Sequence, residues 1–197
     1  GNQTSAMAAA GTQGPSRGGA DNAQLWNGSS WSDSSELNTE ASGRGGSGSG
    51  TGAFIFGGST NSATGGIADS ELFDGTAWSE VNNLNQARYS QSGCGSPTSS
   101  LCISGYGNPP GAYVTNVESW NGTSWTEIAD VNIAQGIGGA AGASGSNAVK
   151  FGGSGGPTGF SAITELWNGS SWTEIGNLTS SYTGNVGAGS AASAINT

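Results

Sequence analysis

One ten-residue stretch recurs four times in this chain without any drift in spacing. The fourth copy reads E-L-W-N-G-S-S-W-T-E at Glu165–Glu174, and earlier copies lie at Gln24–Asp33, Glu71–Glu80 and Glu118–Glu127. The second tryptophan of each copy follows the previous one by 47 residues. A constant period of this length indicates tandem duplication of one structural unit, as in propellers, solenoids and arrays.

The centre of each copy predicts a β-hairpin. Asn-Gly or Asp-Gly between extended segments favours a type I′ turn, because both central residues of that turn need a positive φ. A loop of two or of four residues places the flanking aromatic side chains on one face. These aromatic pairs are Trp26 and Trp31, Phe73 and Trp78, Trp120 and Trp125, and Trp167 and Trp172. We interpret them as structural core rather than as a sugar-stacking platform, since a ligand site rarely needs the same pair in every repeat.

Composition narrows the fold class and the partners. Glycine accounts for 38 of the 197 residues, charged residues are 9%, and no stretch keeps a helical spacing of apolar residues, so we expect an all-β chain. The net charge of −9 and the four basic residues exclude a phosphate-binding patch, so we expect no nucleic-acid partner. No apolar run is long enough for membrane insertion. The chain starts with Gly1 and carries no signal peptide, which suggests a piece of a longer product.

The period divides the chain into a single repeat domain over residues 1–197. The repeat phases are 3–49, 50–96, 97–144 and 145–188, each with about four short antiparallel strands. Residues 189–197 then return to the phase of the opening strand, 3–11. Two architectures follow: the chain ends meet and close a ring of four units, or the surplus strand pairs with the sheet edge of a neighbouring chain.

The order of features in each unit resembles the kelch repeat. A Gly pair ends an apolar strand in F-I-F-G-G at 54–58, a variable loop follows, and Glu71–Arg88 supplies an aromatic, a Trp, a Leu and an Arg. The Gly pair is replaced by Ala10-Gly11 and Ser104-Gly105 in two copies, and the arginine occurs once. The N-G-T-S-W-T-E version is similar to kelch-like repeats in virion and tail-fibre proteins of aquatic bacteriophages.

This resemblance implies a four-bladed β-propeller of four 47-residue kelch-like repeats. It implies a non-enzymatic, extracellular recognition or adhesion module on a virion that binds a host surface glycan or protein. The variable loops are where such contacts usually lie. Their aromatic residues, which could stack on sugars, are Tyr106, Tyr113, Phe160 and Tyr182. The alternative is a structural decoration or filament subunit that joins other subunits by edge-strand pairing through 189–197.

Acidic residues also follow the period. One series is Asp33, Glu80, Glu127 and Glu174, and the other is Gln24, Glu71, Glu118 and Glu165. A catalytic carboxylate pair is conceivable, but a repeated series is typical of scaffold, either solvated charges or acceptors for backbone N–H groups. Histidine is absent, so we expect no enzyme and no resident cofactor. Ca²⁺ is the one metal that clustered carboxylates would suit, with Asp69, Glu71 and Asp74 as the best local group.

The two cysteines, Cys94 and Cys102, flank a turn and lie at equal distances from Thr98. Cross-strand pairing is geometrically plausible there, so one interpretation is a structural disulfide in an oxidising compartment. The other interpretation is two free buried thiols.

Overall fold

The computed structural model describes residues 4–13, 18–60, 65–107, 111–155, 159–187 and 189–190. Every regular element in this part of the chain is a β-strand, and all strand pairs are antiparallel. This confirms the all-β prediction. Of residues 189–197, only Gly189 and Ser190 belong to the described part.

Four main sheets follow one another along the chain. The first has the order β1-β4-β5, the second β6-β7-β8-β9 and the third β11-β12-β15-β16. In the fourth, β18 and β17 both pair with β19, which continues to β20 and β21. Their bounds are β1 Ala6–Ala9, β4 Ala23–Trp26, β5 Trp31–Asp33, β6 Gly45–Ser49, β7 Gly52–Phe56, β8 Ser70–Phe73, β9 Trp78–Val81, β11 Ser92–Ser96, β12 Ser99–Ile103, β15 Val117–Trp120, β16 Trp125–Ile128, β17 Gln135–Gly136, β18 Gly139–Ser144, β19 Asn147–Gly155, β20 Phe160–Trp167 and β21 Trp172–Glu174.

Two small sheets lie in the connecting loops. One pairs β2 (Thr12–Gln13) with β3 (Gly18–Gly19), and the other joins β10 (Arg88–Tyr89), β13 (Tyr106–Gly107) and β14 (Ala112–Tyr113). In the fourth repeat the equivalent segments are continuous with the long strands β19 and β20, and the end of β19 pairs with β17.

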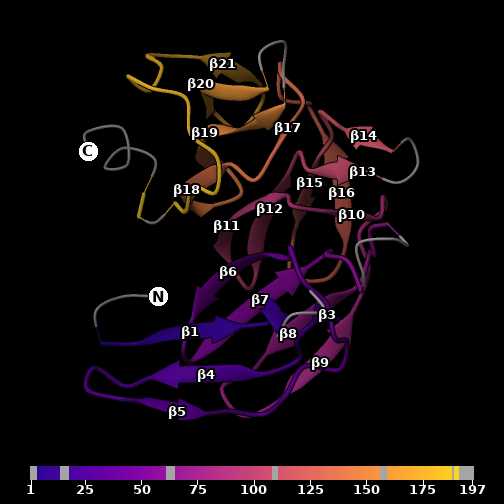
Figure 1. Ribbon diagram of the computed structural model, residues 1–197, viewed down its shortest axis with the longest axis vertical. Helices are drawn as coiled ribbons and strands as arrows, with labels where there is room; N and C mark the ends of the chain where they lie inside the picture. Colours follow the sequence, from indigo (N-terminus) through magenta and orange to yellow (C-terminus); the bar gives the residue numbers. More distant parts are fainter. Residues whose placement is uncertain are drawn as a thin grey trace.

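The main sheets are arranged as a fan (Figure 1). The inner strands β6, β11 and β18 lie on the central side of their sheets, where β6 and β18 both contact β11, and β1 forms the central edge of the first sheet. Among the described residues, no strand of the first sheet pairs with a strand of the fourth.

Each complete sheet combines strands from two of the repeat phases. The small-residue strand β6 belongs to the end of phase 3–49, yet it pairs along its length with β7, from Gly45↔Phe56 to Ser49↔Gly52. The same hairpin recurs between β11 and β12. The inner strand of a sheet is therefore supplied by the residues that precede its Gly-pair strand.

The aromatic hairpins have four-residue loops, since Trp26 pairs directly with Trp31. Asn27 does not adopt a positive φ, and in this loop only Gly28 does, at 96°. The Asn27 Oδ1 instead accepts the N–H groups of Ser29 and Ser30, at 2.9 and 3.0 Å. The type I′ prediction is thus wrong, because the Asn side chain caps the loop rather than supplying an unusual backbone angle.

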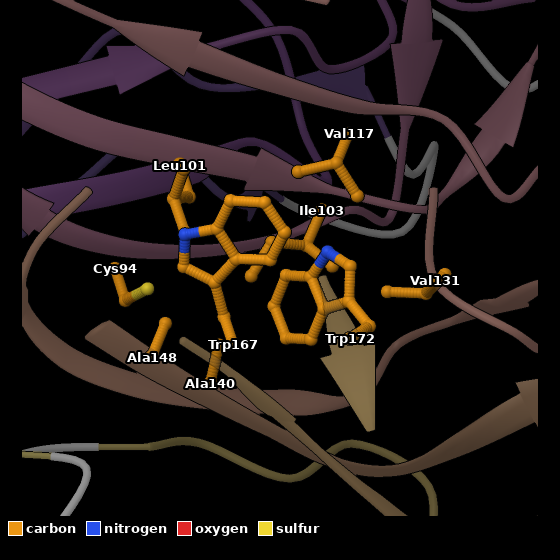
Figure 2. Packing of buried hydrophobic residues seen from close by; sticks show 9 residues of the cluster. All are labelled: Cys94, Leu101, Ile103, Val117, Val131, Ala140, Ala148, Trp167 and Trp172. Atoms are coloured by element: carbon orange, nitrogen blue, oxygen red, sulfur yellow. The ribbon is translucent and has the colours of Figure 1, made fainter. Parts of the chain in front are cut away.

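The prediction that the paired rings share a face is confirmed. Their ring centroids lie 5.6, 5.2, 5.4 and 5.3 Å apart in the four repeats. From the second sheet onward the pair packs against the preceding sheet, as Trp125 stacks on Phe54 at 5.5 Å. Figure 2 shows Trp167 and Trp172 of the fourth sheet against Leu101, Ile103 and Val131. In the first repeat Trp31 is 49% exposed, so the core interpretation fails there.

Where the Gly pair is replaced by Ala10-Gly11 or Ser104-Gly105, glycine is kept at the second position, which has the less accessible backbone angle. The first position has φ near 60° in all four repeats, at Ala10, Gly57, Ser104 and Gly152. This is the left-handed region that other residues enter at a moderate energetic cost. The second position, always glycine, has φ of 105–121°, where a Cβ is strongly disfavoured.

This difference in backbone angle predicts that two neighbouring substitutions in the first repeat will change stability by different amounts. Gly11 has φ of 121° with open space around the site of a Cβ, so Gly11→Ala should lower the free energy of unfolding by about 1–3 kcal/mol through backbone strain alone. Ala10→Gly relieves a left-handed alanine and should change stability by less than about 1 kcal/mol. Urea titration of both variants tests this, and equal destabilisation would contradict it.

Candidate functional site

The inner acidic series lies buried at the junctions between sheets. Glu71, Glu118 and Glu165 are 0–1% exposed. Glu118 Oε2 accepts the backbone N–H and the side-chain Nδ2 of Asn85, both at 2.7 Å, and Oε1 accepts the backbone N–H of Gln86 at 3.3 Å. Because Asn85 comes just after the hairpin of the preceding sheet, this carboxylate ties two sheets together. We call this arrangement the carboxylate latch.

The latch occurs at all three internal junctions. Asn38 donates to Glu71 Oε2 from its backbone N–H at 2.7 Å and from Nδ2 at 3.0 Å. Asn132 donates in the same way to Glu165 Oε2, at 2.8 and 2.6 Å. The interpretation of this series as acceptors for backbone N–H groups is therefore confirmed. The Nδ2 of each Asn also donates, over 3.3–3.4 Å, to the backbone carbonyl of the second Trp in the following sheet. These tryptophans are Trp78, Trp125 and Trp172.

Two of the three latches contain an ion pair, and the basic residues near the three carboxylates come from different places in the repeat. Arg44, at the start of an inner strand, meets Glu71 at 3.1 Å, whereas Arg88 meets Glu118 at 2.8 Å. Lys150 is the direct cross-strand neighbour of Glu165, whose Oε1 is buried without a hydrogen-bond partner. Its ammonium donates to Gln135 Oε1, and burial lowers the Lys150 pKa to about 8, against the opposing attraction of Glu165.

The outer acidic series is exposed. Glu80, Glu127 and Glu174 lie directly across from the latch carboxylates in the pairs Glu71↔Glu80, Glu118↔Glu127 and Glu165↔Glu174. Each candidate carboxylate pair thus consists of one solvated group and one group already occupied by N–H donors.

Of the residues proposed for Ca²⁺, Asp69 and Glu71 both accept hydrogen bonds from Thr39, whereas Asp74 lies at the far end of β8. Asp69 precedes strand β8 and Asp74 follows it, while Glu71 is engaged in its latch. Asp74 Oδ1 accepts the N–H groups of Thr76 and Ala77 at 2.8 and 2.9 Å. Within the described residues no group of three or more His, Cys, Asp or Glu side chains is placed to hold a metal ion.

The two cysteines are free and buried. The turn between β11 and β12 has two residues, Pro97 and Thr98, so Cys94 pairs with Leu101 and Cys102 with Gly93. This offset of one residue sends the thiols to opposite faces of the sheet, and the disulfide interpretation is corrected accordingly. Cys94 joins the core towards the fourth sheet, whereas Cys102 faces the second and accepts from Arg88 Nε at 3.2 Å.

The candidate contact residues form one cluster and one exposed pair. Tyr106 lies 5.2 Å from Tyr89 and 5.5 Å from Tyr113, ring centroid to centroid, on the small sheet of β10, β13 and β14. Tyr89 was missed from the sequence because it belongs to the preceding repeat and reaches the loop only through strand pairing. Burial, together with the two neighbouring phenols, raises the pKa of Tyr89.

All three rings of this tyrosine cluster are partly exposed. Tyr106 Oη donates to the Gly111 carbonyl at 2.5 Å, which ties the start of β14 to this ring. The Tyr113 ring lies over Gly136 and Gly155 of the fourth sheet. The cluster therefore spans two sheets and is held by both.

Phe160 and Tyr182, each 55% exposed, are the other two candidates. They occupy adjacent places at the edge of the fourth sheet, because Tyr182 forms a β-bridge with Ser161. They do not belong to the tyrosine cluster.

A cavity of about 750 Å³ lies at the centre of the fan. It is lined by β1, β6, β11 and β18 and by the segment around Val186 and Gly187. Its walls are mostly Gly, Ala and Ser, with Arg44 as a charged contributor.

Comparison with known proteins gives information on the fold alone. No family model matches the chain, and no curated protein matches it. Among solved structures, the one described as "Structure of YjhT" is similar with a TM-score of 0.69 and 8% identity over 83% of this chain. The match covers 62% of the YjhT chain. In the described residues there is no helix long and apolar enough to cross a membrane.

The latch predicts that alanine substitution at a buried carboxylate costs far more stability than the same substitution at the equivalent position of the first sheet. Glu118→Ala leaves Arg88 buried without its partner and should lower the free energy of unfolding by about 3–5 kcal/mol. Gln24→Ala alters the equivalent exposed position of the first sheet and should stay within about 0.5 kcal/mol of the parent. Chemical denaturation of both variants measures this, and similar values would show that the latch does not stabilise the junction.

The burial of both thiols predicts how they react with a thiol-specific reagent. Burial raises the pKa of Cys94 to about 12 and that of Cys102 to about 11, so a thiol-specific reagent at neutral pH should label neither in the native protein. Both should react in denaturant without a reductant. Failure to react in denaturant would restore the disulfide interpretation.

Proposed function

We propose that this chain is a kelch-like β-propeller, with each main sheet as one of four blades, and that it acts as an extracellular recognition or adhesion module. We further propose that it is a bacteriophage virion protein, of a tail or fibre, that binds a host surface glycan or protein through its loops. The fan of antiparallel sheets with inner strands around one cavity supports the propeller assignment (Figure 1), as does the similarity in fold to YjhT.

The tyrosine cluster is the observation that carries the binding proposal. Three partly exposed rings meet on a loop sheet, whereas the equivalent positions of the second repeat are Ser42, Ser59 and Gly66. Since the second repeat does without these rings, the scaffold does not require them. Tyrosine supplies a rigid amphipathic surface at a low cost in conformational entropy, which suits sugar rings and protein surfaces.

The scaffold supports this role by holding the loop rigidly. Arg88, next to Tyr89, is fixed by its ion pair with Glu118 at 2.8 Å and by Cys102. Tyr113 rests on Gly136 and Gly155 of the fourth sheet, so the cluster is in contact with both sheets. A preorganised surface loses less entropy when a ligand binds. The net charge of −9 favours neutral or basic ligands over anionic ones.

A glycan array probed with the labelled chain tests the proposal. Tyr106→Ala should weaken binding to the recognised glycan by about tenfold or more, which corresponds to about 1.4 kcal/mol. Tyr106→Phe keeps the ring and removes only the hydroxyl bond to Gly111, so it should bind like the parent.

Substitution of all four candidates, Tyr106, Tyr113, Phe160 and Tyr182, by alanine should abolish binding. Retained binding by this variant, with its circular dichroism unchanged, would refute the loop-aromatic version of the proposal. Binding to host cells treated with glycosidase separates a protein receptor from a glycan.

A further inference from the structure

One residue beside the tyrosine cluster has a backbone angle that its own side chain disfavours. Ile137 has a φ of 56°, which lies in the left-handed region, where a branched Cβ makes the conformation a clear outlier. Among the described residues, it is the one β-branched residue with a positive φ. Outliers of this kind persist only where the surrounding structure imposes them, and they are concentrated at binding sites.

The repeat imposes this backbone angle but does not require an isoleucine to build it. The four equivalent positions, spaced by 47 residues, all have φ between 56° and 75°. In each step from one repeat to the next, the backbone N–H donates to the carbonyl of the preceding member over 2.7–2.8 Å. The members are Gly43, Ser90, Ile137 and Gly184. Since glycine serves at two of them, the scaffold has no need of a large apolar side chain there.

Burial in the core does not explain the isoleucine either. The Ile137 side chain is 43% exposed, so much of its apolar surface gains nothing from removal from water. A branched residue held at an unfavourable φ and left half in solvent costs the fold energy for little return. We therefore looked for a contact that this side chain makes outside the fold.

Ile137 adjoins the tyrosine cluster on two sides. Its backbone N–H donates at 2.7 Å to the carbonyl of Ser90, the residue that follows Tyr89. The residue before it, Gly136, lies so close to the Tyr113 ring that a Cβ there would collide with the ring. Strands β14 and β17, which carry Tyr113 and Gly136, meet at the junction of the third and fourth sheets (Figure 1). The exposed isoleucine and the three rings are therefore neighbours on one surface.

The three rings form a platform rather than a slot. Tyr106 lies 5.2 Å from Tyr89 and 5.5 Å from Tyr113 between ring centroids, so neighbouring rings touch and leave no space for a ligand ring between them. A ligand has to lie against their outer surface. Tyrosine suits the C–H face of a sugar ring there, since it is apolar and rigid and carries a polar tip. Isoleucine offers no hydrogen bond and matches only an apolar substituent.

Charge narrows the class of ligand further. All three basic side chains of the described residues are buried, with Arg44 3% exposed, Arg88 0% and Lys150 1%. This part of the chain therefore presents no side-chain cation to pair with the carboxylate, sulfate or phosphate of an acidic glycan. The net charge of −9 also repels such a ligand. A neutral glycan fits the surface better than an acidic one.

We propose that the tyrosine cluster binds neutral glycans whose sugars carry a methyl group, and that Ile137 is the residue that recognises the methyl group. The rings hold the C–H face of a sugar, while Ile137 contacts the methyl of an N-acetyl or a 6-deoxy group. This inference rests on the proposed function, because it takes the tyrosine cluster as the ligand site. N-acetyl and 6-deoxy sugars offer the same contact, and the experiment separates them.

Calorimetric titration with defined oligosaccharides tests the proposal. The probes are trimers of N-acetylglucosamine, rhamnose, glucose and galacturonic acid, of which the first two carry methyl groups and the last is acidic. The parent should bind one of the methyl-bearing trimers more tightly than the glucose trimer by about fourfold or more, the amount that burial of one methyl group contributes. The galacturonic acid trimer should bind no more tightly than the glucose trimer.

Ile137→Asn isolates the contact. Asparagine enters the left-handed region more readily than isoleucine, so the urea midpoint should stay close to that of the parent. The variant should bind the preferred methyl-bearing trimer about fourfold or more weakly, with its affinity for the glucose trimer unchanged. Ile137→Val keeps a branched apolar side chain and should keep the preference. Trp31→Asn, at an apolar residue 49% exposed in the first sheet, is the matched control and should leave every affinity unchanged.

Failure of this inference and failure of the proposed function give different results. If Tyr106→Ala weakens binding of every trimer while Ile137→Asn leaves the preference unchanged, the cluster is the site but Ile137 does not set its specificity. Tighter binding of the galacturonic acid trimer by the parent overturns the neutral class. Binding that Tyr106→Ala leaves intact, or no binding of any glycan, refutes the glycan form of the proposed function and this inference with it.

Discussion

The buried carboxylate latch is the interaction on which the arrangement of the sheets depends. A carboxylate that is removed from water needs several hydrogen-bond donors and a nearby positive charge. Here the donors are the Asn side chain and the backbone that follow the preceding hairpin, as in Asn85 and Gln86 with Glu118. Since donor and acceptor belong to different sheets, satisfying the charge also sets how those sheets meet.

This requirement explains how so few basic residues are used. The chain has four, of which Arg17 lies outside the described residues. Arg44 and Arg88 each form an ion pair with a latch carboxylate, and Lys150 lies directly across from the third. The first sheet carries Gln24 and has no such cation requirement at that position. Its Trp31 side chain is 49% exposed, whereas the equivalent Trp78, Trp125 and Trp172 are buried.

Local patterns were readable from the sequence because their physics is local. The 47-residue period, the hairpins and the aromatic pairs follow from residues close together in the chain, and their strand pairing is as predicted. The cysteine prediction failed for a local reason of a different kind. A turn of two residues rather than three shifts the register by one, and the sequence around Pro97 and Thr98 did not distinguish the two.

Contacts between repeats could not be predicted from the sequence, because they depend on how the sheets pack. Arg44, Arg88 and Lys150 occupy three different phases, so aligning the repeats gives no sign that they perform one task; only the crossing of strands brings each to its Glu. Tyr89 reaches Tyr106 for the same reason. The unit and its strands were thus determined by the repeated sequence, through turn chemistry and alternation along a strand. The partners of the buried charges, and which faces remain open, were decided by packing between sheets, because burial is a property of the assembled fold.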